Sequence, residues 1–292
     1  MIGQQLVNAL MLGSNYALVA IGYTLVFGVL RLLNFAHPNV CVLGGFLLFS
    51  AVGTLALPLP AAIAVVIVGG AVLGLATERL CFRPAEHLRD ELAPAISSVA
   101  FALVLTELVA KVWGAEPRRL PPLVTGATFD LGLFQVSSIQ LVILGLSFGL
   151  MLGVDYLLQH TRMGYALRAV AEQRDVAQLL GVNVRATVVW AFLLSGVLAA
   201  LAGMLLAMRI GLADPNVGLS YGLRALAVMV LGGLGNVRGA MVAGLLVGLV
   251  DVMALAFLSQ AYSSVAAWVL LLVVLLCKPS GLLGTRLQRE SI

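Results

Sequence analysis

Two polar interruptions in an otherwise apolar chain carry the residues best suited to chemistry. In the first interruption, RLLNFAHPN at 31–39, Asn34 and His37 offer side-chain donors and acceptors. Pro38 lacks a backbone N–H and disfavours helical angles at His37, so it frees nearby backbone groups. The two side chains can bond those groups or a passing solute. Metal binding by His37 is disfavoured, because no second His, Cys or carboxylate lies at ligand spacing.

The second interruption, LGGLGNVRGA at 231–240, lies near the other end of the chain. It is not a phosphate-binding loop, since that motif ends in Gly-Lys-Ser/Thr and the only lysines, Lys111 and Lys278, lie elsewhere. Both interruptions follow one apolar segment and precede another, which suggests a repeat with a transport pathway at its interface. The pathway residues we predict are Asn34, His37, Gly232, Gly233, Gly235 and Asn236.

Composition decides which elements position these residues. Of 292 residues, 61% are hydrophobic and only 10% are charged, whereas about 25% are charged in an ordinary soluble domain. The chain is therefore predicted to be an all-α, polytopic membrane protein. Backbone that leaves a helix at membrane depth must be satisfied by protein or by a water-filled cavity. The first interruption could lie at that depth, or form a surface loop from which Arg31 reaches water.

Apolar windows predict membrane spans at 6–30, 40–57, 61–80, 92–112, 138–158, 188–208 and 262–277. The Gly-rich region at 223–258 could be one long tilted helix, two crossings, or one crossing plus a re-entrant piece. We therefore predict about eight to ten transmembrane helices, with broken helices among them. No stretch is long and polar enough for a soluble domain, so residues 1–292 are expected to form one transmembrane domain.

Basic residues predict the orientation. Ten of them flank two predicted loops and the C-terminal tail: Arg79, Arg83, Arg89, Arg162, Arg168, Arg174, Arg185, Lys278, Arg286 and Arg289. These regions are expected to face the cytoplasm. Arg118 and Arg119, in the Pro-rich loop at 114–135, fall on the opposite side but are outnumbered. Topology thus explains the net charge of +4, and we expect no nucleic-acid partner.

The stretch TRMGYALRAVAEQRDVAQLLGVNV at 161–184 is too polar to span a membrane and too regular to be a linker. A helix of this kind can rest on lipid or be presented to a soluble partner. Anionic headgroups would repel Glu172 and Asp175, so the mixed charge favours a partner.

Four stretches of the chain resemble the inner-membrane permeases of branched-chain amino-acid ABC importers. They are SNYALVAIGYTLVFGVLRLLNFAH at 14–37, the stretch at 161–184, LGGLGNVRGAMVAG at 231–244 and KPSGLLG at 278–284. The resemblance covers nearly the whole chain and implies a type II importer fold in a bacterial plasma (inner) membrane. The chain departs from the family at Pro38-Asn39, where Gly-Glu is common, and at Asn236 and Arg238, where smaller residues are usual. These departures bear on which solute is carried.

The resemblance implies a permease subunit that forms the pathway for branched-chain or other neutral amino acids. It also implies no cofactor in this chain, because ATP and Mg bind to partner subunits. The implied partners are a second permease, identical or homologous, two cytoplasmic ATP-binding subunits, an external or periplasmic solute-binding protein, and membrane lipid. A coupling segment at about 161–185 is expected to contact the ATPase through Glu172, Arg174, Asp175, Ala177 and Gly181.

Other functions stay open. Relatives with this architecture carry urea, short amides and other small solutes. A stand-alone secondary transporter or channel driven by protons would need a titratable relay, for which Glu107 and Asp251 are the candidates. An intramembrane enzyme would need a nucleophile or metal constellation, and the sequence holds no His-Glu-x-x-His and no paired aspartates. We therefore expect a transporter subunit rather than an enzyme.

Overall fold

The computed structural model describes residues 2–85, 92–121, 123, 128–130, 135–258 and 260–284. Its helices are α1 (Ile2–Leu30), α2 (His37–Phe49), α3 (Leu59–Thr77), α4 (Arg83–Ala85), α5 (Ala93–Trp113), α6 (Ser138–His160), α7 (Arg162–Glu172), α8 (Arg174–Leu179), α9 (Val184–Ile210), α10 (Val217–Gly232), α11 (Val237–Phe257) and α12 (Gln260–Cys277). Two π-helical turns, η1 (Ser50–Thr54) and η2 (Glu78–Phe82), extend α2 and α3. The short strands are β1 (Arg118–Arg119), β2 (Thr128–Asp130), β3 (Gln135–Ser137) and β4 (Leu212–Ala213).

Within these ranges, seven helical segments are long and apolar enough to cross a membrane, and two shorter apolar helices, 217–232 and 265–277, accompany them. The all-α, multi-pass prediction is confirmed, and these segments agree with the predicted number of spans. In the Gly-rich region α10 and α11 are separate helices, so the option of one long tilted helix is wrong.

Local sequence sets where several helices begin and end. Side-chain oxygens of Ser137 and Asn183 accept backbone N–H bonds at the starts of α6 and α9, which satisfies donors that the first helical turn leaves free. Gly114 and Gly211 end α5 and α9 with positive φ. These ends give the long helices fixed lengths.

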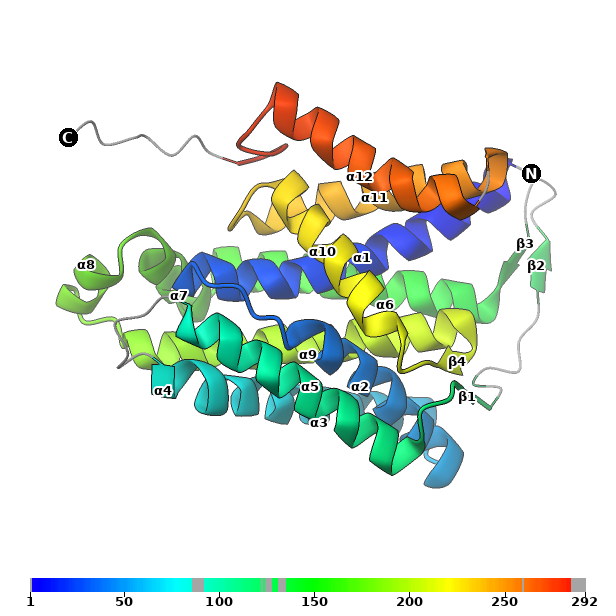
Figure 1. Cartoon of the computed structure of the whole chain (residues 1–292), viewed down its shortest axis with the longest axis horizontal. Coiled ribbons are helices and arrows are strands. Elements are labelled where there is room, and N and C mark those ends of the chain that lie inside the picture. Colours follow the sequence, from blue (N-terminus) through cyan, green and yellow to red (C-terminus); the bar gives the residue numbers. More distant parts are fainter. Residues whose placement is uncertain are drawn as a thin grey trace.

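The long helices run along one axis of the molecule, with α1 and α9 at the centre (Figure 1). Helix α1 packs on α9, α10 and α11, and α9 packs on α2 and α3. The backbones of α1 and α11 touch at small residues, since a Cβ on Gly248 would lie 2.2 Å from the Cα of Gly13. Close packing of this kind drives helix association in lipid, where no hydrophobic effect acts between helices. By contrast α3, α5 and α6 bury only a minority of their residues within the molecule.

The two ends of the molecule differ. Helices α4, α7 and α8 gather at one, here called the α8 end, and the four strands at the other, here called the strand end (Figure 1). At the strand end β1 pairs with β4 and β2 with β3, both antiparallel. The described basic residues of the predicted cytoplasmic regions lie toward the α8 end, while Arg118 and Arg119 lie in β1. Arg89, Arg286 and Arg289 lie outside the described residues.

Candidate translocation site

The first interruption turns the chain back into the body of the molecule. Helix α1 ends at Leu30, and Arg31 follows with φ +58°, while its N–H donates to the Phe27 carbonyl at 2.8 Å. Non-helical backbone then runs from the α8 end inward to the start of α2 (Figure 1). Arg31 is exposed and Asn34 is buried, so the interruption begins at the surface and ends inside.

His37 is the innermost polar residue of this interruption and is 1% exposed. Its Nε2 lies 3.1 Å from the carbonyl of Val19, and its Nδ1 lies 3.2 Å from Oγ of Ser195. Gly22 makes room for the ring, because a Cβ there would lie 2.5 Å from Cε1 of His37. Gly22 precedes the end of α1 by about two helical turns, or roughly 12 Å. The interruption therefore runs into the interior of the helix bundle, which favours membrane depth over a surface loop; its depth in the bilayer stays a prediction.

Asn34 and Asn39 fix the backbone around His37. The Asn34 Oδ1 accepts a hydrogen bond from the Ala36 N–H at 3.0 Å, which closes a tight turn. The Asn39 amide donates to Thr106 Oγ1 at 2.8 Å and to the Ala102 carbonyl, both on α5. The polar atoms of Asn34 and His37 thus bond the chain itself in this conformation, and their role in a pathway stays a prediction.

The second interruption is a turn between α10 and α11. Gly233 and Gly235 adopt φ +108° and +83°, a region that favours glycine. The Asn236 side chain caps α11 and also donates to the Leu283 carbonyl at 2.6 Å. The Leu283 N–H in turn donates to the Gly232 carbonyl at 3.0 Å. The segment at 278–284, which sequence singled out, is therefore docked on this turn.

Both interruptions meet at one cavity of about 1010 Å³ at the α8 end. Its lining includes Arg31, Asp155, Glu172, Gly235, Asn236 and Arg238. The predicted pathway residues Gly235 and Asn236 and the predicted coupling residue Glu172 thus line the same cavity, although the sequence analysis gave them different functions. Asn34, His37, Gly232 and Gly233 belong to the same two interruptions but are not among the residues that line it.

Two polar bridges cross the walls of this cavity. Arg238 donates from Nε and Nη2 to both Asp155 carboxylate oxygens, at 2.8 and 3.1 Å, and so joins the start of α11 to α6. Arg31 Nη2 donates to the Ala171 carbonyl of α7 at 3.3 Å. Sequence reasoning missed the first bridge because 83 residues separate its partners. It accounts for an arginine at a position where smaller residues are usual.

The predicted coupling segment forms α7 and α8, with a break at Gln173. Glu172, Arg174 and Asp175 are exposed as expected, but Ala177 is buried. Gly181 follows α8 with φ +85°. The most exposed apolar residues are Leu179 and Leu180, at 86% and 79%. Sequence reasoning did not include them among the predicted contact residues, although an apolar pair inside a polar stretch was an available signal.

A second buried polar cluster joins α1, α10 and α11. The Tyr16 hydroxyl donates to Asp251 Oδ2 at 3.0 Å and accepts from Arg224 Nη1 at 2.6 Å. Arg224 also pairs with Asp251 at 3.2 Å. Asp251 thus sits in an ion pair, which is the ordinary way for proteins to bury a carboxylate. Within the described ranges, no group of three His, Cys, Asp or Glu residues could hold a metal ion.

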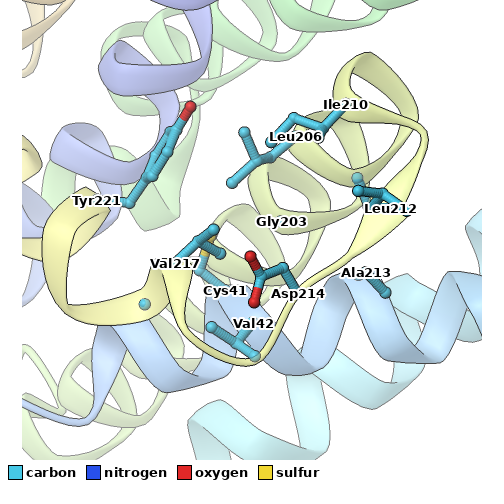
Figure 2. A pocket seen from close by; sticks show the side chains of 13 residues that line it. Cys41, Val42, Gly203, Leu206, Ile210, Leu212, Ala213, Asp214, Val217 and Tyr221 are labelled. Atoms are coloured by element: carbon cyan, nitrogen blue, oxygen red, sulfur yellow. The ribbon is translucent and has the colours of Figure 1, made fainter. Parts of the chain in front are cut away.

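A much smaller cavity lies toward the strand end, between α2, α9 and α10 (Figure 2). Figure 2 shows the Asp214 carboxylate pointing into it, among Cys41, Val42, Leu206 and Val217. Its volume of about 10 Å³ suits at most one water molecule. In this conformation the larger cavity is therefore the better candidate for a solute.

The fold and the site define a multi-pass membrane protein of the plasma membrane in which two broken-helix regions meet at a cavity. Residues 5–275 match the model of the family described as the branched-chain amino acid transport system permease component. The chain belongs to this family.

Curated relatives cover almost the whole chain. It is 34% identical over 293 residues to the high-affinity branched-chain amino acid transport system permease protein BraD of Pseudomonas aeruginosa, covering 96% of this chain and 95% of BraD. It is 34% identical over 294 residues to the LivH permease of the corresponding system in Escherichia coli K12, with the same coverage. A solved structure, PsaBC from Streptococcus pneumoniae in complex with Fab, matches with TM-score 0.52 and 14% identity, over 94% of this chain and 90% of that chain. It shares the fold.

Proposed function

We propose that this chain is the membrane-spanning subunit of an ATP-driven importer for branched-chain or other neutral amino acids. It forms the translocation pathway, and partner subunits bind ATP and Mg and hydrolyse the ATP. Its family supports this proposal, as do relatives that are named for high-affinity branched-chain amino acid transport and align over nearly their full length.

The projection of α8 is the observation that carries the proposal. Helix α8 lies at one end of the molecule (Figure 1). Leu179 and Leu180 are exposed there, in the same stretch as the exposed charged residues Glu172 and Asp175. Exposed apolar side chains rimmed by polar ones are typical of a protein contact. The two carboxylates disfavour an anionic lipid surface. We assign a groove of a cytoplasmic ATPase subunit as the partner of this tip.

Glu172, Arg174, Asp175 and Gly181 complete the proposed contact with the ATPase. Ala177 acts differently from the sequence-based expectation, since a buried residue anchors α8 rather than touching the partner. A firmly anchored tip moves together with its helix. Closure of the ATPase dimer on ATP would shift α7 and α8 as one body and tilt the attached spans, so that access to the pathway alternates.

We assign the remaining partners to the two ends of the molecule. The α8 end, with its basic residues, faces the cytoplasm, and the strand end faces the external or periplasmic solute-binding protein. A second permease, identical or homologous, completes the membrane core. The large cavity is the cytoplasmic mouth of the pathway, lined by Gly235 and Asn236. The pathway continues past the other predicted residues of the two interruptions, Asn34, His37, Gly232 and Gly233.

Co-purification from the native host tests the proposal. We expect two ATPase subunits and a second permease to accompany the chain, and proteoliposomes of this complex with the binding protein to accumulate radiolabelled leucine only with ATP. Leu179→Asp combined with Leu180→Asp should release the ATPase. Gln178→Ala, an exposed polar neighbour, serves as the control and should retain it. Accumulation without ATP, or an ATPase that stays bound to the double variant, contradicts the proposal.

A further inference from the structure

We propose that Arg31 is a positioning residue that transmits movement of α7 and α8 to the first interruption and onward to α5. This inference rests on the proposed function, because the ATPase supplies the movement. The residue meets α7 at one end of the interruption, while the other end is held in the core.

The contact on α7 lies in its last turn, where backbone carbonyls lack hydrogen-bond partners within the helix. Ala171 is the residue before the last of α7, so its carbonyl lacks a partner within the helix. The Arg31 guanidinium donates to this carbonyl at 3.3 Å, and a positive charge at a helix C-terminus also complements the helix dipole. Directly after α7, Gln173 has an extended backbone conformation that separates α7 from α8. Arg31 therefore contacts the end of α7, next to the segment that we propose binds the ATPase.

The backbone of Arg31 is held in an unusual conformation. A φ of +58° is uncommon for a residue with a side chain. Its N–H bond to the Phe27 carbonyl keeps it on the last turn of α1, and its side chain spans to α7. A residue held from both sides passes displacement on better than one that can rotate freely.

Downstream of Arg31 the interruption is tied to α5 by three hydrogen bonds. The Phe35 N–H donates to Ser98 Oγ at 3.0 Å. The Asn39 amide donates to the Ala102 carbonyl and to Thr106 Oγ1, one and two turns further along α5 respectively. Since α5 buries few of its residues and packs chiefly on α2 and η2, these bonds are a large part of its attachment. His37, fixed between α1 and α9, is the pivot.

Arg168 provides a matched control. It lines the same cavity and carries the same charge, but its guanidinium carbon lies 4.9 Å from the centre of the Tyr165 ring, within α7 itself. Loss of Arg168 therefore removes the same charge from the cavity without cutting the link between α7 and the interruption.

The test uses the complete importer with its own ATPases, carrying Cys277→Ser and Phe35→Cys. Cys41 and Cys81 are buried, whereas position 35 is 37% exposed, so a maleimide reports on the interruption. We expect the labelling rate at position 35 to change when ATP and vanadate trap the ATPase. Arg31→Ala should remove most of that change and lower leucine imported per ATP about threefold to tenfold, as loss of one charge-assisted hydrogen bond allows.

Further variants separate the outcomes. Arg31→Lys, which keeps a charged donor, should restore part of the labelling change, and Arg168→Ala, which cuts no contact between α7 and the interruption, should keep the parent's labelling change. An Arg31→Ala importer whose labelling change persists overturns the inference, as does equal loss in Arg168→Ala, which would assign the effect to cavity charge. A parent importer that shows neither ATP-dependent labelling nor ATP hydrolysis by its partners instead overturns the proposed function, and this inference with it.

Discussion

The imidazole of His37 bridges two helices that are far apart in the sequence, because its Nδ1 lies 3.2 Å from Ser195 Oγ on α9 while Nε2 faces the Val19 carbonyl on α1. The bridge holds the first turn of α2 between the two most buried helices of the molecule. It makes the broken helix a fixed part of the core rather than a loose surface loop.

His37→Ala should lower the free energy of unfolding by about 1–3 kcal/mol, because it removes two buried hydrogen bonds and leaves a cavity. Thermal unfolding in detergent, followed by tryptophan fluorescence, measures the change. Ser195→Ala should cost less, because it deletes one small group. An unchanged midpoint together with a weaker apparent affinity for leucine would instead indicate that His37 contacts the solute.

Gly233→Ala and Gly235→Ala should differ, although both positions have positive φ. A Cβ at Gly233 would lie 2.6 Å from the Gly284 backbone, whereas the nearest atom to one at Gly235 is 3.8 Å away. Strain alone costs about 1 kcal/mol at either site, and the clash adds to it only at Gly233. We expect Gly233→Ala to undock the segment at 278–284 and speed its proteolysis. Equal proteolysis of the two variants would contradict this packing.

Asp251→Ala should destabilise the protein by about 3–5 kcal/mol, since it leaves Arg224 without its anion at membrane depth. The double variant Asp251→Leu with Arg224→Met should recover most of that loss, because an apolar pair carries no desolvation cost. Unfolding midpoints of the single and double variants in detergent measure both effects. If the double variant keeps ATP-dependent leucine uptake, Asp251 is not a proton relay; loss of uptake from a well-folded double variant would favour one.

Gly181→Leu should uncouple uptake from ATP hydrolysis. Gly181 ends α8 with φ +85° and has no heavy atom within 4 Å of a would-be Cβ, so the penalty arises from backbone strain rather than from a clash. A leucine side chain at position 181 would move the backbone out of the left-handed region and change the direction of α8. Gly181→Asn is the control, since asparagine tolerates this conformation. Leucine uptake per ATP hydrolysed, measured in proteoliposomes, should fall only for Gly181→Leu.

Sequence reasoning was most successful for the spans, because lipid demands long apolar runs and the chain has few polar residues that blur them. It could not choose between one helix and two in the Gly-rich region. That choice depends on Gly233 and Gly235 taking positive φ and on Asn236 capping α11. Glycines permit such angles without requiring them.

The site was less predictable because its contacts are long-range. The types of Asn34 and His37 indicated a break, but its depth depends on the space that Gly22 leaves for the ring. The pairing of Arg238 with Asp155 joins segments that have no shared pattern. Exposure of Leu179 follows from the packing of its neighbour Ala177, which a helical pattern of only six residues does not fix.

The close packing of α1 on α11 has a consequence for biogenesis. Tyr16 meets Asp251 across 235 residues of chain, so translation at about 5–20 residues per second separates their synthesis by roughly 12–50 s. Throughout that interval the first helix lacks the partner that will cover its polar hydroxyl and its glycine surface. Nascent chains stalled before the eleventh helix should therefore be held by the insertion machinery rather than released into lipid.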